Sequence, residues 1–184
     1  VDTDVANFAI EEQTENGEHI TPHVVEPSFG VGRTVYTLLD HGYSEDTVDT
    51  ESRTYPSLVP EIAPTDDAVF PLVSNEHELL AVADEVADSL RDAVVAVTYD
   101  ESGSVGRRYR RQDEVGTPFC VTVDHEGLEG DDTTVTLRER DSADQIRLPV
   151  DDLAAELEPL LAGDRAFADL REIHRTVDTD VTTT

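Results

Sequence analysis

The chain has 184 residues, which is enough for one or two domains with a hydrophobic core. It carries 13 basic residues, all of them Arg, against 42 acidic ones, so its formal net charge is −29. Hydrophobic residues make up 38% of the chain, which excludes a fully disordered protein. The sequence contains no apolar run long enough for a membrane span, and its single cysteine excludes an internal disulfide framework.

Other features of composition indicate the setting of the protein. The excess of acids and the loss of every Lys favour adaptation to a salt-rich cytoplasm, because salt screens the self-repulsion of a highly charged chain. A generic acidic interaction surface is the alternative, but it does not require the loss of every Lys. The chain begins with Val rather than Met, so we expect it to be a piece of a longer protein. Cys120 lies in an apolar run and is expected to be a small buried hydrophobe.

The N-terminal third predicts a strand over 17–26, a glycine-containing turn at 28–33 and a helix over 34–42. Residues 43–65 are acidic, contain three prolines and show no sustained period. We expect this segment to be a linker, or a connection wrapped over a neighbouring element, that separates a domain at 1–42 from one at 66–175.

The second region predicts strands over 68–74, 93–99, 118–125, 134–140 and 145–150. Helical spacing predicts helices over 76–92, 104–116, 151–163 and 164–175. The alternation implies an α/β domain with a mixed five-stranded sheet and flanking helices, followed by a disordered tail at 176–184.

The arginines are concentrated in one part of the chain. Seven of the 13 lie within residues 107–147, and residues 103–112 carry four Arg and no acid. In a chain this acidic, the cluster is the place where a phosphate group could bind. The alternative is that these side chains form internal ion pairs with Asp113, Glu114, Glu139 and Asp141.

Three blocks of sequence resemble a known family. Residues 22–39, PHVVEPSFGVGRTVYTLL, resemble motif 3 of the class II aminoacyl-tRNA synthetases, and the form EPSFGVGR is similar to the glycyl-tRNA synthetases. Residues 102–124 and 136–147 follow in the family's order and resemble its anticodon-binding domain, of the archaeal and eukaryotic type. The resemblance covers about residues 8–175. It implies that residues 1–42 are a strand–helix remnant at the C-terminal end of the antiparallel catalytic domain, and that 66–175 are the anticodon-binding domain.

The resemblance also implies a glycine and ATP site. Glu26 and Ser28 occupy alternate positions, share one face of an extended segment, and match the family's contacts to the glycine substrate. Arg33 matches the motif 3 arginine at the ATP phosphates and is the expected catalytic residue. The full expected set is Glu26, Pro27, Ser28 and Gly30 for glycine, and Gly30, Gly32 and Arg33 for ATP. The alternatives are a rim carboxylate for Glu26 and an ion pair between Glu26 and Arg33.

The implied activity belongs to a longer enzyme. It is the ATP-dependent activation of glycine to glycyl-adenylate and its transfer to tRNA(Gly), carried out by a cytoplasmic homodimer with Mg²⁺ accompanying ATP. Nothing in the chain matches motif 1 or motif 2, so we expect no aminoacylation by the chain alone. No bound metal is expected, because a Pro-containing strand separates His19 from His23. A non-catalytic tRNA-binding or other nucleic-acid-binding module of the same fold is the alternative function; a generic acidic interaction protein does not account for EPSFGVGR.

The expected contacts to the anticodon combine stacking planes with hydrogen-bond donors, which is what unstacked bases require. Counterion release contributes little in high salt, so directed contacts should dominate. The expected residues are Arg107, Arg108, Tyr109, Arg138 and Arg140. The alternative is that about half of these arginines are internal struts.

Overall fold

The computed structural model describes residues 25–48, 50–93 and 95–177 of the chain. It divides into two compact units, residues 1–36 and 37–184. Most of the strand expected at 17–26, with His19 and His23, lies outside the described residues, and its last two residues have no regular structure. The division falls inside a helix, so the domain boundaries at 42 and 65 remain predictions.

Helix α1 (Val31–Gly42) begins three residues earlier than the sequence pattern predicts. The amides of Arg33 and Thr34 donate to the carbonyl oxygen of Gly30 at 3.0 and 3.1 Å, which starts the helix there. Gly32 and Arg33, expected in a turn, therefore lie in its first turn.

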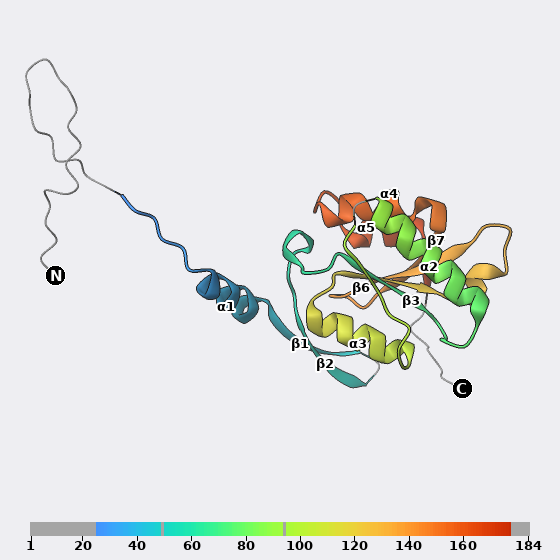
Figure 1. Cartoon of the computed structure of the whole chain (residues 1–184), viewed down its shortest axis with the longest axis horizontal. Coiled ribbons are helices and arrows are strands. Elements are labelled where there is room, and N and C mark those ends of the chain that lie inside the picture. Colours follow the sequence, from blue (N-terminus) through green and yellow to red (C-terminus); the bar gives the residue numbers. More distant parts are fainter. Residues whose placement is uncertain (1–24, 49, 94, 178–184) are drawn as a thin grey trace, which may run out of the picture. The chain divides into compact units, whose positions relative to one another are not determined.

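A six-stranded sheet forms the centre of the second unit, and it confirms the mixed α/β fold (Figure 1). Its strand order is β4-β3-β5-β6-β7-β8. The first three of these strands are parallel and the other neighbours are antiparallel. The strands are β3 (Asp67–Pro71), β4 (Val97–Tyr99), β5 (Phe119–Val123), β6 (Thr134–Glu139), β7 (Gln145–Pro149) and β8 (Arg175–Val177).

Five strands were expected, and β8 is the sixth. Its last two residues fall in the segment predicted to be a disordered tail, yet they pair with β7. Backbone hydrogen bonds to the edge of β7 stabilise β8. Only one of its three residues is apolar, so the sequence shows no hydrophobic alternation that would predict a strand here. Residues 178–184 lie outside the described residues.

Helices cover both faces of the sheet. Helices α2 (His77–Asp92), α4 (Val150–Leu161) and α5 (Phe167–Ile173) lie on one face and α3 (Val105–Val115) on the other (Figure 1). Successive residues of β3 serve the two layers, since Val69 packs under α2 and α4 whereas Ala68 and Phe70 pack under α3. Strands β3 and β5 are buried throughout for this reason. Two short 3₁₀ helices, η2 (Pro60–Ile62) and η3 (Glu126–Leu128), lie in connections, and none of the described helices is long and apolar enough to cross a membrane.

Residues 43–56, in the segment expected to be a linker or a connection wrapped over a neighbouring element, form a β-hairpin that docks on α3. Strands β1 (Tyr43–Val48) and β2 (Glu51–Pro56) pair antiparallel, and β2 packs against α3. Arg53 and Tyr55, two residues apart on one face of β2, are buried at 3% and 8% exposure. The inward face of the hairpin therefore carries a guanidinium and a phenol rather than aliphatic side chains, which is why hydrophobic periodicity did not reveal it.

Gly116 ends α3, as the sequence predicts, and also fits the hairpin against the helix. It adopts a left-handed conformation with φ of 92°. A Cβ atom at this position would lie 2.9 Å from Cγ of Pro56. Glycine is thus required both by the backbone angle and by the close approach of β2.

Candidate nucleic-acid interface

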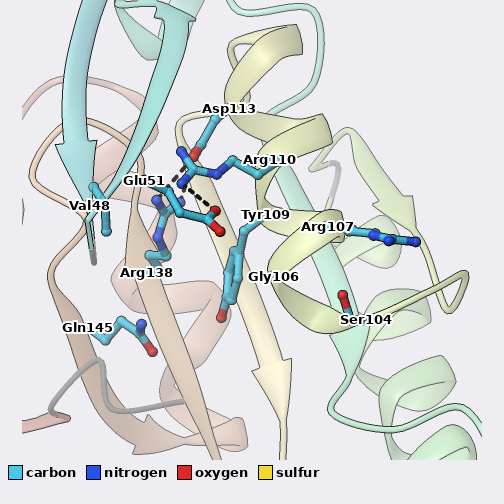
Figure 2. A pocket seen from close by; sticks show the side chains of 10 residues that line it. All are labelled: Val48, Glu51, Ser104, Gly106, Arg107, Tyr109, Arg110, Asp113, Arg138 and Gln145. Atoms are coloured by element: carbon cyan, nitrogen blue, oxygen red, sulfur yellow. Dashed lines mark hydrogen bonds and ion pairs between the residues drawn. The ribbon is translucent and has the colours of Figure 1, made fainter. Parts of the chain in front are cut away.

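A pocket of about 330 Å³ lies between the β1–β2 hairpin, helix α3 and the adjoining face of the sheet (Figure 2). The hairpin, which the sequence did not predict, supplies one wall. The side chains that give the pocket its chemistry are Val48 and Glu51 of the hairpin, Arg107, Tyr109, Arg110 and Asp113 of α3, Arg138 of β6 and Gln145 of β7.

The inner wall of the pocket is held by Arg138 and Asp113. Two nitrogens of Arg138 donate to the two carboxylate oxygens of Asp113 at 2.8 and 3.2 Å. The Arg138 guanidinium lies over the ring of Tyr109, 4.9 Å from its centroid. The Tyr109 hydroxyl lies 2.6 Å from Oγ1 of Thr122, and burial raises the pKa of Tyr109 to about 12, so the phenol is neutral at physiological pH. These contacts fix a flat, partly apolar surface inside the pocket.

Three of the five residues expected to read the anticodon point inward. Arg108 is 1% exposed and donates to the carbonyl oxygens of Pro71, Glu101 and Gly103. Arg138 and Arg140 are 4% and 3% exposed. Arg140 donates to the carbonyl oxygens of Gly116 and Leu58 and to the carboxylate of Asp141. In this structure these three guanidiniums act as internal struts, which is the alternative that the sequence left open, and Asp113 and Asp141 are partners that it named.

The other arginines of α3 differ in whether an ion pair already neutralises their charge. Arg107 is exposed and makes no ion pair with any residue that the structure describes; Figure 2 shows it extending away from Glu51 and Arg110. Arg111 is held by Asp100, with Nε 3.0 Å from the carboxylate. Arg110 pairs with Glu51 at 3.1 Å. Arg107 and Tyr109 are thus the expected residues that remain able to meet a ligand at the pocket.

Gln145 is a pocket residue that the sequence reasoning missed. It is only 8% exposed, lines the pocket, and lies opposite Arg138 in the β6–β7 register. Within the described ranges its side-chain amide makes no hydrogen bond, so both a donor and an acceptor face the pocket. Its place at the start of the predicted strand 145–150, as a polar residue ahead of an apolar run, was the available signal. Glu51 and Val48 gave none, because their segment was expected to be a linker.

The candidate glycine and ATP residues belong to the first unit. Glu26, Pro27, Ser28 and Gly30 lie in an exposed segment without regular structure, and Gly32 and Arg33 are exposed in α1. In this structure Glu26 and Arg33 do not form the ion pair that the sequence analysis gave as an alternative. Exposed apolar side chains accompany them, since Phe29 is 88% and Val31 79% exposed. Their roles remain predictions.

Comparison with known proteins identifies the fold of the second unit. Residues 67–160 match the family model Anticodon binding domain. The chain belongs to this family. A solved structure, prolyl-tRNA synthetase from Cryptosporidium parvum complexed with L-proline and AMP, shares the fold with a TM-score of 0.54 and 22% identity, over 59% of this chain and 23% of that one.

The resemblance to glycyl-tRNA synthetases is also confirmed, over more of the chain than the anticodon binding domain alone. The glycine–tRNA ligase of Methanothrix thermoacetophila is 44% identical over 158 residues, which is 86% of this chain and 27% of that protein. Those of Archaeoglobus fulgidus and Methanothermobacter thermautotrophicus are 43% and 46% identical over 86% and 85% of this chain. The chain spans about a quarter of the length of these relatives.

Proposed function

We propose that the chain is the C-terminal part of a glycine–tRNA ligase and that its anticodon binding domain holds tRNA(Gly). The observation that carries the proposal is the 43–46% identity to glycine–tRNA ligases over 85–86% of this chain. The reaction of the whole protein is the ATP-dependent formation of glycyl-adenylate and the transfer of glycine to tRNA(Gly). A homodimeric, cytoplasmic full-length protein is part of the same proposal.

The pocket beside α3 has the chemistry that an unstacked anticodon base needs. The amide of Gln145 can both donate to and accept from a base edge. The ring of Tyr109, fixed under Arg138, offers a stacking surface. Arg110 lies beside these groups and is suited to a phosphate that flanks the base, whereas the exposed guanidinium of Arg107 is suited to a base edge. Base recognition would thus come from Gln145 of the sheet with Tyr109 and Arg107 of α3, and backbone recognition from Arg110 of α3.

In the same proposal, residues of the first unit serve the reaction. The carboxylate of Glu26 binds the glycine ammonium, and the hydroxyl of Ser28 donates to the substrate. Gly30 and Gly32 leave room for adenine, and Arg33 binds ATP phosphates and stabilises the charge that develops as pyrophosphate leaves. Mg²⁺ would arrive on the phosphates of ATP. Among residues 25–36 the only carboxylate is that of Glu26, and the described residues hold no cluster of three metal-ligating side chains.

Binding of tRNA by the chain tests the RNA part of the proposal. A filter-binding series would compare a tRNA(Gly) transcript with the same transcript carrying an unrelated anticodon, at several fixed KCl concentrations. We expect the first to bind at least about tenfold more tightly, because each correct base contact contributes on the order of 1–3 kcal/mol. Circular dichroism at each concentration establishes that the chain is folded. Equal binding of the two transcripts by the folded chain would contradict the proposal.

The full-length protein tests the catalytic part. Glycine-dependent ATP–pyrophosphate exchange is expected from it and not from the chain alone. Glu26→Ala in the full-length protein should raise the KM for glycine far more than the KM for ATP, because the glycine ammonium loses its charged partner. Ser44→Ala, in the hairpin, is a control that should change neither KM. Equal losses for glycine and ATP in Glu26→Ala would assign Glu26 a structural role instead.

A further inference from the structure

An ion pair between two elements lies at the edge of the pocket beside α3. Glu51, the first residue of β2, reaches across to Arg110 of α3, with a carboxylate oxygen 3.1 Å from Nη2 (Figure 2). The side chain of Glu51 is 76% exposed and that of Arg110 is 27% exposed. A pair this open to water contributes little to folding. Its position at the edge of the pocket therefore needs a reason other than stability.

Arg110 differs from the other arginines around the pocket. Arg108, Arg138 and Arg140 each donate to two or more internal acceptor atoms, whereas Arg110 has Glu51 as its one acceptor among the residues described. Its Nη1 is buried and has no hydrogen-bond partner. Arg110 is thus a fixed guanidinium with spare donors and a single, weakly held anion.

We propose that Glu51 is an internal competitor of the RNA, which in the free protein occupies the position on Arg110 that an RNA phosphate oxygen takes in the complex. This inference rests on the proposed function of the chain. A carboxylate and a phosphate bind a guanidinium through the same hydrogen bonds, so they compete for Arg110. If Glu51 stayed in place, its charge would lie beside the phosphate and repel it.

Every RNA that binds Arg110 must displace Glu51, at the same cost in free energy. RNAs differ in the contacts that they form in the pocket. An RNA held only through its phosphates gains one contact to Arg110 and loses the Glu51 pair. An RNA that also places a matching base against Gln145 gains additional hydrogen bonds inside the pocket. The cost of displacing Glu51 is the same for both, so Glu51 lowers the affinity for each RNA by the same factor and leaves the choice between them to the base contacts.

The displacement needs only a local movement. Glu51 directly follows the turn residue Thr50, whose φ is 70°, and precedes the anchoring residue Arg53 by two positions. The bonds of Arg53 to Asp46 and Asp113 involve neither Glu51 nor Arg110. A rotation of the exposed Glu51 side chain is therefore enough to free Arg110.

The test measures RNA binding by the full chain with Glu51→Gln, Arg110→Gln and the double variant. Glu51→Gln should raise the affinity for tRNA(Gly) and for a tRNA with an unrelated anticodon by the same factor, about three- to tenfold. The plot of log K against log KCl should keep its slope in Glu51→Gln, because the same phosphate meets Arg110, and should become shallower by about 0.7 to 0.9 in Arg110→Gln, which loses that phosphate contact. In the Arg110→Gln background, Glu51→Gln should have no effect. Glu85→Gln, an equal charge change on α2 across the sheet, should leave affinity and slope unchanged.

The outcomes separate this inference from the proposed function. A wild-type chain that is folded yet binds no tRNA would overturn the proposed function and this inference with it. A wild-type chain that prefers tRNA(Gly), with Glu51→Gln leaving both affinities unchanged, would overturn the inference alone. Weaker binding by Glu51→Gln would also overturn it, because Glu51 would then contact the RNA itself.

Discussion

Asp113 of α3 and Arg53 of β2 are 60 residues apart in the sequence, and their side chains meet with Oδ2 3.2 Å from Nη1. Both side chains are almost completely buried. Asp113 also accepts two hydrogen bonds from Arg138 of β6. One carboxylate therefore joins the hairpin, the helix and the sheet, which are the three elements that enclose the pocket.

Replacing Asp113 should destabilise the fold strongly. Asp113→Asn keeps the shape of the side chain but leaves the guanidiniums of Arg138 and Arg53 without its charge. We expect the free energy of unfolding to fall by about 3–5 kcal/mol, the usual cost of removing one partner of a buried ion pair. Urea denaturation at fixed KCl measures it. Asp88→Asn, which breaks an exposed pair with Arg91, should change stability by less than about 0.5 kcal/mol. A similar small loss for Asp113→Asn would show that the network contributes little.

Asp67 predicts a pH dependence of stability. It is fully buried at the start of β3, one carboxylate oxygen has no partner, and burial raises the pKa of its carboxyl well above the ordinary value. Because the folded state binds this proton more tightly than the unfolded chain, the stability it contributes is fully present below the unfolded pKa of about 3.9. That stability is lost as the pH rises from there through the folded-state pKa.

Asp67→Asn removes this dependence because the amide has no proton to lose. The difference in unfolding free energy, variant minus wild type, should increase as the pH rises above the unfolded-state pKa of Asp67. Denaturation curves at a series of pH values check it, with Asp92→Asn at the exposed end of α2 as the control. A difference that does not vary with pH would mean that Asp67 is ionised in the folded state.

Arg107 and Arg140 should respond differently to the same conservative change. Replacement by Lys keeps the charge but removes the planar guanidinium. Arg107→Lys should weaken binding of tRNA(Gly) by about 1–3 kcal/mol and scarcely affect a tRNA with an unrelated anticodon. Arg140→Lys should instead lower stability, because Arg140 donates to the carbonyl oxygens of Gly116 and Leu58, and should leave the preference between tRNAs unchanged.

The control for both is Arg171→Lys in α5, outside the pocket, measured in the same filter-binding series. If Arg107→Lys does not separate the two tRNAs, Arg107 is a phosphate contact or lies off the RNA. If Arg140→Lys separates them without loss of stability, the buried position of Arg140 does not describe the complex.

The net charge of −29 predicts that folding depends on salt. Screening shortens the Debye length from about 10 Å at 0.1 M to about 3 Å at 1 M, so self-repulsion within the acidic chain weakens as KCl is added. Circular dichroism should show loss of structure on dilution from molar KCl. Equal stability at 0.1 M and 3 M KCl would refute the adaptation to salt.

Most of the elements that the sequence predicted have an aliphatic buried face, whereas the helix α3 was predicted although its buried face is largely polar. Helix α2 and strand β5 have the aliphatic pattern, and Gly116 marks the end of α3. The inward face of α3 combines Val105 with Arg108, Tyr109 and Gln112, so its polarity hides its burial. Arg108 is buried because carbonyl oxygens from β3 and from the loop after β4 converge on it. Such acceptors come from distant segments, and no local period reports them.

The pocket was predictable only in part for the same reason. The arginine cluster on α3 marked the right helix, and Tyr109 and Arg107 were named from it. Whether each guanidinium points out or in depends on tertiary partners such as Asp113 and Pro71. The opposite wall comes from a hairpin anchored by Arg53 through contacts to residues up to 88 positions away. Those contacts arise from the folded arrangement and leave no trace in the composition of residues 43–65.

The buried thiol of Cys120 allows the opening of the central sheet to be followed by thiol modification. It is 1% exposed in β5, between β3 and β6, and burial raises the pKa of the thiol well above its ordinary value. Thiol reagents attack only an accessible thiolate, so modification must wait until the central strand separates from its neighbours. As the sequence contains no other cysteine, the rate of modification counts the openings of the middle of the sheet. RNA that stabilises the domain would lower the rate of Cys120 modification. The effect of RNA on the sheet can thus be measured without introducing a dye or spin label.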